Sequence, residues 1–212
     1  MGVRDEYGRI RKMMYRVNEI FYSLQGEGFW TGTPMVFVRF SGCNLRCPFC
    51  DTDHSGATML SAAEIVAASE AALAGGRDLP PRVCLTGGEP SLQVDTELVT
   101  AFHEAGFLLH IETNGTRPLV DGIDWVTLSP KEDVEGLVGG GKVVLERADE
   151  LKLVYSHGVD PSRWLSFPAT WHFLQPCALP DGSVNTSETV SYILSHPSWR
   201  LSLQTHKLLD IR

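Results

Sequence analysis

The chain has 212 residues, of which 43% are hydrophobic and 21% are charged, and it carries a formal net charge of −8. This composition is typical of a globular domain large enough to bury a core, and the acidic balance disfavours a nucleic-acid partner. No apolar run approaches the roughly 20 residues of a membrane-spanning helix. The first residues are charged and lack the apolar segment of a signal peptide, so we expect a cytoplasmic protein with no membrane partner.

Strands and helices are predicted to alternate along the chain. Apolar segments bounded by turn residues indicate strands at 17–23, 35–40, 83–86, 107–113, 125–128, 150–154, 171–175 and 201–204. Helices are expected at 62–74, 96–105 and 185–195. Ser61 and Glu64 complete a capping box before the first helix, and Asn185 stands at the N-cap of the last. Residues 131–149 include three successive glycines and give no clear prediction.

Strands that alternate with helices predict an α/β fold with a mainly parallel sheet. In such folds the functional residues follow the carboxyl ends of strands, and polar or glycine-rich segments follow most of the strands predicted here. The chain is too short for a complete eightfold barrel with all its helices. We therefore expect a partial, open (βα)6-type TIM-like barrel with reduced helices.

Three of the five cysteines, Cys43, Cys47 and Cys50, lie within eight residues. Their spacing allows three thiolates to hold a 4Fe–4S cluster, which leaves one iron open to another ligand. A zinc site with His54 as its fourth ligand is the first alternative, and three thiols that bind no metal are the second. Zinc usually takes four ligands, often as two spaced pairs, and the absence of a second pair favours the cluster.

Two motifs together resemble the radical S-adenosylmethionine (SAM) enzymes: the cysteine loop, and Gly87-Gly88-Glu89-Pro90 after a short predicted strand. Within that superfamily the chain resembles the 7-carboxy-7-deazaguanine synthase family. The supporting segments are 21–28 (FYSLQGEG), Arg39, 50–52 (CDT), 112–115 (ETNG), 129–131 (SPK), 174–176 (LQP) and 204–207 (QTHK). The resemblance covers residues 14–212, interpreted as one radical SAM domain. Residues 1–13 are then a leader that is disordered or precedes the true start.

The resemblance implies that the protein converts 6-carboxy-5,6,7,8-tetrahydropterin to 7-carboxy-7-deazaguanine by radical ring contraction, with loss of ammonia. The protein is thus expected to be a radical SAM lyase in the biosynthesis of 7-deazapurines of the queuosine type. The implied cofactors are a 4Fe–4S cluster, SAM and Mg2+. The implied partners are a second copy of the chain in a homodimer and a flavodoxin or ferredoxin as electron donor. Because SAM carries the radical, no side chain is assigned as a catalytic acid or base.

The same resemblance assigns roles to residues at matching positions. Thr52 is the implied Mg2+ ligand, although Asp51 is the better ligand by charge alone. SAM is expected to contact Phe49, Cys50, Asp51, Gly88, Glu89, Thr113, Asn114, Ser129, Pro130, Lys131 and Gln175. The pterin substrate is expected to contact Leu24, Gln25, Gly26, Glu27, Arg39, Thr86, His206 and Arg212.

The residues alone leave a structural alternative beside each assignment. Arg39 lies on an apolar strand, where it either grips a substrate carboxylate or forms a structural salt bridge. Glu89 is alternatively a solvated residue of a tight turn, and Phe49 a buried anchor of the cysteine loop. The alternative for Thr52 is a local contact between its hydroxyl and the backbone. A lone histidine such as His206 is more often structural.

Two other functions are considered as alternatives. Another small radical SAM enzyme, such as a glycyl-radical activating enzyme, shares the cysteine loop and the GGEP motif but acts on a protein partner. Residues 24–27, Arg39 and Thr52 instead suit a small carboxylated heterocycle. An iron–sulfur electron carrier usually supplies four cysteines to close its cluster. Three cysteines beside a GGEP motif argue against that alternative.

Overall fold

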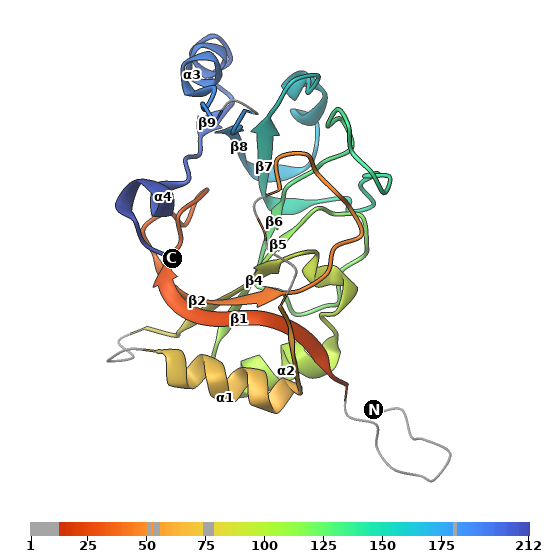
Figure 1. Ribbon diagram of the computed structural model, residues 1–212, viewed down its shortest axis with the longest axis vertical. Helices are drawn as coiled ribbons and strands as arrows, with labels where there is room; N and C mark the ends of the chain where they lie inside the picture. The colour runs from red at the N-terminus through yellow and green to blue at the C-terminus, as the bar shows by residue number, and fades with distance from the viewer. Residues whose placement is uncertain (1–12, 51, 53–55, 74–78, 180–181) are drawn as a thin grey trace.

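The computed structural model describes residues 13–50, 52, 56–73, 79–179 and 182–212. These residues form one nine-stranded sheet in the order β3-β1-β2-β4-β5-β6-β7-β8-β9 (Figure 1). The strands are β1 (Tyr15–Leu24), β2 (Pro34–Phe40), β3 (Thr58–Leu60), β4 (Arg82–Gly87), β5 (Leu108–Thr113), β6 (Trp125–Leu128), β7 (Ala148–Tyr155), β8 (Ala169–Pro176) and β9 (Arg200–Leu201). β1 pairs antiparallel with β2 and with β3, and every other neighbouring pair is parallel.

The sheet is curved but not closed, because its edge strands β3 and β9 are not hydrogen-bonded neighbours in the described residues. The helices are α1 (Ala62–Ala72), α2 (Thr96–Glu104), α3 (Thr186–Ser195) and α4 (Thr205–Leu209), with 3-10 turns at Pro90–Leu92 and Pro161–Trp164. α1 and α2 pack beneath β1, β2 and β5, while α3 contacts β8 and β9 (Figure 1). This architecture confirms the predicted partial, open barrel with reduced helices.

Side chains that alternate along the strands explain why the outside of the barrel is apolar and its interior is polar. On β7, Leu151 and Leu153 are buried in an apolar cluster, whereas the intervening Lys152 lines the interior pocket. On the other side of the molecule, Leu98 and Phe102 of α2 are fully buried against the sheet in a larger apolar cluster. The strands that carry the charged side chains are therefore supported by apolar clusters outside the barrel, and the burial of these clusters does not depend on the charges.

Most local predictions agree with the structure. The capping box of α1 is present: the Ser61 amide donates to Glu64 at 2.8 Å, and the Glu64 amide donates to the Ser61 hydroxyl at 3.4 Å. Asn185 occupies the N-cap of α3, but its side chain does not cap that helix. It accepts instead from the amide of Cys177 and donates to the carbonyl of Tyr155, both at 2.7 Å, which joins three segments.

Two short elements, β3 and α4, were not predicted from the sequence. β3 exists through its pairing with β1, and α4 through contacts with the turn between β1 and β2. Within the described ranges no helix is both long and apolar enough to cross a membrane. Apart from Met13, the expected leader lies outside the described residues.

Candidate active site

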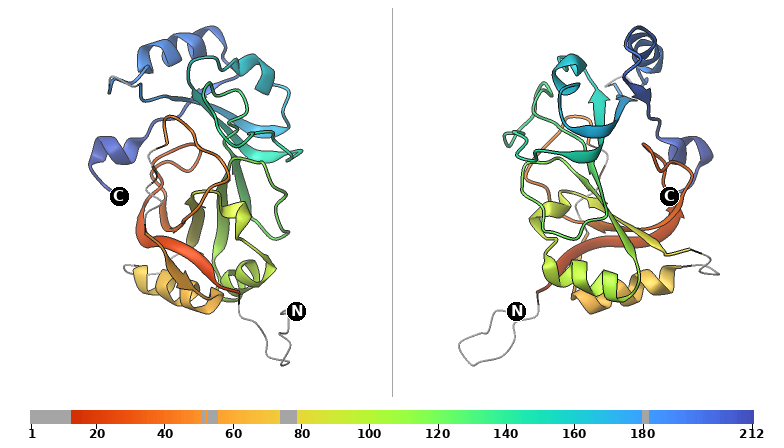
Figure 2. Two further views of the ribbon diagram at one scale, coloured as in Figure 1. Left: turned by 45° about the vertical axis from the view of Figure 1, so that its right-hand side comes forward. Right: turned by 180° about the vertical axis from the view of Figure 1, so that it is seen from behind.

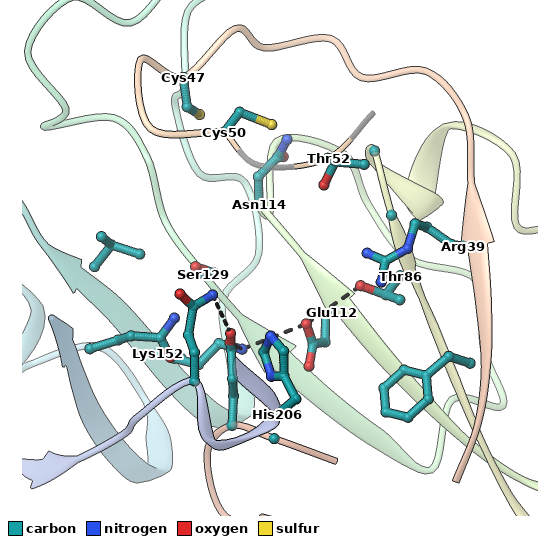
Figure 3. A pocket seen from close by; sticks show the side chains of 18 of the residues that line it. Arg39, Cys47, Cys50, Thr52, Thr86, Glu112, Asn114, Ser129, Lys152 and His206 are labelled. Carbon is teal, nitrogen blue, oxygen red and sulfur yellow. Dashed lines mark hydrogen bonds and ion pairs between the residues drawn. The ribbon is translucent and has the colours of Figure 1, made fainter. Parts of the chain in front are cut away.

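A cavity of about 650 Å³ opens at the carboxyl ends of the parallel strands, a volume typical of a small-molecule site. Cys47, Cys50 and Thr52 lie at one end of it, and Lys152, Glu112 and His206 lie toward the other (Figure 3). Among the predicted site residues, Pro130 is buried but does not line the cavity, and Asp51 lies outside the described residues. The predicted residues that line it are Leu24, Gln25, Gly26, Glu27, Arg39, Cys43, Cys47, Phe49, Cys50, Thr52, Thr86, Gly88, Glu89, Thr113, Asn114, Ser129, Lys131, Gln175, His206 and Arg212.

The cysteine loop leaves β2 and is held against the end of β4 by backbone hydrogen bonds. The Gly88 amide donates to the Phe40 carbonyl, and the Glu89 amide donates to the Gly42 carbonyl, each at 2.9 Å. A Cβ atom at Gly88 would lie 2.0 Å from the Gly42 oxygen, a distance that no side chain tolerates. Glycine at this position therefore allows the two backbone segments to approach each other.

The three thiols of the loop fit a cluster better than a single ion. All three are free and line the cavity, and burial raises the pKa of Cys43 and of Cys47. Within the described residues, no three Cys, His, Asp or Glu side chains form a group that could hold one metal ion. A zinc site needs such convergence, whereas thiolates on a four-iron cluster bind three different iron atoms. His54, the ligand considered for zinc, lies outside the described residues.

Glu89 is buried at 1% exposure and is not a solvated turn residue. Its carboxylate accepts from the Thr113 hydroxyl at 2.6 Å, the Asn114 amide at 2.7 Å and the Ser91 amide at 3.0 Å. These bonds join the turn after β4 to the end of β5. A carboxylate has about four acceptor positions, so Glu89 retains room for one further donor from a ligand.

Arg39 and Thr86 lie side by side on the wall between the two ends of the cavity (Figure 3). The Nε of Arg39 donates to Glu19 at 2.8 Å, so the structural salt bridge considered for this arginine is present. This contact uses one nitrogen of the guanidinium, and the side chain remains 30% exposed in the cavity. A salt bridge to Glu19 is therefore compatible with a carboxylate ligand on the other nitrogens.

The end of the cavity opposite the cysteines contains a network of buried charges. Lys152 forms ion pairs with Glu27 and with Glu112, the latter at 3.6 Å, and its side chain is only 5% exposed. Gln25 donates to Glu112 at 3.0 Å, and Gln204 donates to Glu27 at 2.9 Å. Burial raises the pKa of Glu27, but the Lys152 ammonium outweighs this effect and holds that pKa at about 2.

Glu112, Lys152 and Gln204 line the cavity but were assigned no role from the sequence. The signal that drew attention to Arg39, a charge on a mainly apolar strand, is present for Glu112 in LLHIET and for Lys152 in ADELKLVY. Applied to every predicted strand, that criterion finds both residues.

The C-terminal segment packs against the turn between β1 and β2 (Figures 1 and 2). The Thr205 amide donates to the Gly26 carbonyl at 3.0 Å, and a Cβ atom at Gly26 would lie 2.2 Å from Nδ1 of His206. Arg212 donates to Glu19 at 2.7 Å, and its carbonyl accepts from the Ser23 hydroxyl at 2.6 Å. These contacts place His206 and Arg212 on the rim of the cavity.

The loop after β6 and the end of β8 complete the wall. The Lys131 ammonium donates to the Ser129 carbonyl at 2.7 Å, and burial lowers the pKa of that lysine to about 8. Gln175 accepts from the Ser202 hydroxyl at 2.9 Å, which fixes the orientation of its amide. Phe49 packs against the apolar cluster on that side, in agreement with an anchoring contact for the cysteine loop.

An open barrel with a three-cysteine loop at the carboxyl ends of its strands defines a radical SAM protein, and residues 37–161 match the model of the radical SAM superfamily. A 7-carboxy-7-deazaguanine synthase from Bacteroides thetaiotaomicron is 53% identical over 200 residues, covering 94% of this chain and all of that relative. The one from Bradyrhizobium diazoefficiens is 43% identical, with the same coverage. The crystal structure of QueE from Escherichia coli matches with a TM-score of 0.70 at 28% identity, covering 90% of this chain and 93% of that one. The chain belongs to the 7-carboxy-7-deazaguanine synthase family.

Proposed function

We propose that this protein is a radical SAM lyase that converts 6-carboxy-5,6,7,8-tetrahydropterin to 7-carboxy-7-deazaguanine and ammonia in the cavity described above. The observation that carries the proposal is that one cavity contains the cysteine loop and, apart from it, an arginine and a set of carboxylates. The arrangement separates a cofactor end from an end suited to a polar heterocycle. Family membership over nearly the whole chain supports the same reaction.

The family implies a 4Fe–4S cluster and SAM, and we propose Cys43, Cys47 and Cys50 as the cluster ligands. When bound, the cluster and SAM supply a carbon-centred radical that removes a hydrogen atom from the substrate. Around SAM, Glu89 accepts from the ammonium of the methionine part, and the Gly88 backbone approaches the ligand closely. Further contacts are proposed for Phe49, Cys50, Asp51, Thr113, Asn114, Ser129, Pro130, Lys131 and Gln175.

A second group of residues, which extends from Thr52 along the cavity wall to the end opposite the cysteines, binds and orients the substrate. Arg39 binds the substrate carboxylate, and the hydroxyl of Thr52 is the proposed protein ligand of an Mg2+ ion that the same carboxylate contacts. Gln25 and Glu27 face the aminopyrimidinone ring. Leu24, Gly26, Thr86, His206 and Arg212 complete the proposed substrate contacts. Holding the substrate in one orientation and excluding water are the protein's contributions to the reaction.

A homodimer, a flavodoxin or ferredoxin as electron donor, and a cytoplasmic location are further proposals, which rest on the family resemblance. A reducing compartment agrees with the proposed cytoplasmic location, because cysteines there are available to bind a metal and are not paired in disulfides.

Anaerobic turnover of the reconstituted protein tests the proposed function. The mixture contains SAM, Mg2+, dithionite and 6-carboxytetrahydropterin, and product is followed by mass spectrometry. We expect 7-carboxy-7-deazaguanine from the wild type and none from Cys47→Ala. If 5′-deoxyadenosine forms while the pterin stays unchanged, the substrate assignment is wrong. If neither product forms in protein with a complete cluster, the enzyme assignment itself fails.

A further inference from the structure

The ammonium of Lys152 is the central charge at the end of the cavity opposite the cysteines. Lys152 lies on β7 and faces three carboxylates from three parts of the fold: Glu27 of the β1–β2 turn, Glu112 of β5 and Glu150 of its own strand. The side chain of Lys152 is 5% exposed, that of Glu27 13% and that of Glu112 24%. Burying a charge is costly unless it is paired, so this arrangement needs the lysine as much as the carboxylates.

Hydrogen bonds from neutral donors, together with the ion pairs to Lys152, orient the carboxylates of Glu27 and Glu112. Gln204 donates to one oxygen of Glu27, and Gln25 donates to one oxygen of Glu112. Glu27 and Glu112 both line the cavity, and acceptor positions remain on their carboxylate oxygens. The end of the cavity is thus rich in hydrogen-bond acceptors whose positions are fixed.

A pterin ring presents N–H donors on its edge, including the 2-amino group and the adjacent ring nitrogen. Two parallel donors of this kind match the two oxygens of an ionised carboxylate. A protonated carboxyl group presents an O–H donor in place of one acceptor, which opposes a ligand N–H. Recognition of such a ring therefore requires carboxylate acceptors that are held in fixed positions.

We propose that Lys152 is a positioning residue for substrate binding: through its two ion pairs, its ammonium fixes Glu27 and Glu112 in place as acceptors for the N–H edge of the pterin. The inference rests on the proposed function and deepens it, because it assigns a role to a residue that the family motifs do not include.

Electrostatics at Lys152 agree with this geometry. Burial lowers its pKa, but Glu112, Glu27 and Glu150 outweigh burial and hold that pKa above its ordinary value. Lys152 therefore stays charged across the physiological range. Two further titratable groups lie near this network: Lys131 from the loop after β6 and His206 from α4. Without the Lys152 charge, burial of Glu27 would raise the pKa of its carboxyl group.

The test compares Lys152→Gln, which keeps an N–H donor but removes the charge, with Lys152→Arg, which keeps a permanent charge. Lys142→Gln, at an exposed position away from the cavity, is the matched control. Each reconstituted protein is assayed for KM of the pterin, KM of SAM and kcat/KM against pH. Binding of 6-carboxytetrahydropterin is also titrated by calorimetry without reductant, which measures affinity independently of turnover.

For Lys152→Gln we expect the pterin to bind at least about tenfold more weakly, the loss expected for a charged hydrogen-bond network. The acid limb of kcat/KM for the pterin should rise by at least about one pH unit, because an unpaired buried carboxyl group protonates more readily. KM for SAM should stay within about twofold. The control should match the wild type, and Lys152→Arg should keep the acid limb of the wild type.

The inference is wrong if Lys152→Gln folds and retains the wild-type pterin affinity and pH profile. It is also wrong if the KM values of pterin and SAM rise together, because that result indicates a general structural defect. If Lys152→Gln does not fold, Lys152→Arg is the deciding variant. A shift in the acid limb of its kcat/KM profile would overturn the inference, because this variant keeps the positive charge. Turnover by the wild type is measured in the same series, so failure of the proposed function is seen separately as no product from any of the proteins.

Discussion

Gly88→Ala is the substitution for which the structure gives the most direct prediction. The new Cβ atom would lie 2.0 Å from the Gly42 oxygen and 2.5 Å from its carbonyl carbon, both of them backbone atoms. Overpacking of this kind costs about 1–3 kcal/mol. Moving the segments apart also weakens the bonds from the Gly88 amide to Phe40 and from the Glu89 amide to Gly42, each worth about 1 kcal/mol. We therefore expect a loss of about 4 kcal/mol in the free energy of unfolding.

For a chain of this length each kcal/mol shifts Tm by about 2–4 °C, so Gly88→Ala should lower Tm by roughly 10 °C in a thermal melt. The same contacts hold the cysteine loop in place, so the iron content of the protein after reconstitution should fall as well. Gly56→Ala is the matched control, because among the described residues a Cβ atom there meets nothing closer than 3.8 Å. A Tm for Gly88→Ala within about 2 °C of the wild type, with iron content retained, would refute the reasoning.

Three further predictions concern stability and the chain terminus. Ser61→Ala removes the capping box of α1 and should cost about 1 kcal/mol in urea unfolding without changing turnover; an unchanged midpoint contradicts it. Burial raises the pKa of Glu150 to about 7 from 4.5, so the folded state holds this proton more tightly and stability falls as pH rises between those values. Glu150→Gln should remove a penalty of about 3 kcal/mol at pH 8 and almost none at pH 4, and equal gains at both pH values would refute the assignment. Arg212→Ala breaks an ion pair with Glu19 in which the arginine is 72% exposed, so Tm should change by less than about 2 °C. Hydrogen exchange of residues 205–211 should nevertheless become faster, and unchanged exchange would show that this pair does not hold the segment.

Every strand except β3 could be predicted, because each of those strands carries its own local signal. β2 is a run of apolar and aromatic residues after a glycine-rich turn, and α1 carries both residues of its capping box. β3 and α4 lack such signals, since three or five residues do not stabilise an element by themselves. They form where β1 offers a free edge and where Gly26 accepts from Thr205.

The same distinction between local and long-range signals separates the two ends of the candidate site. The cysteine loop and the GGEP turn are contiguous motifs, and their residues could be named directly from the sequence. Lys152 and Glu27 are 125 positions apart, and Gln25 and Glu112 are 87 apart. A single sequence shows that a charge on an apolar strand needs a partner, but only the fold identifies that partner.

The two ends of the cavity are also stabilised by different interactions, and this difference has a functional consequence. At the cysteine end, the backbone hydrogen bonds around Gly88 depend little on pH. At the opposite end, the geometry depends on one ammonium shared by three carboxylates, so it depends on the charge of Lys152. Loss of the Lys152 charge should therefore weaken pterin binding before it affects the fold of the cysteine loop. Cleavage of SAM without conversion of the pterin is the behaviour expected when the charged end fails first, and substitutions at Lys152 and at Gly88 should separate the two defects.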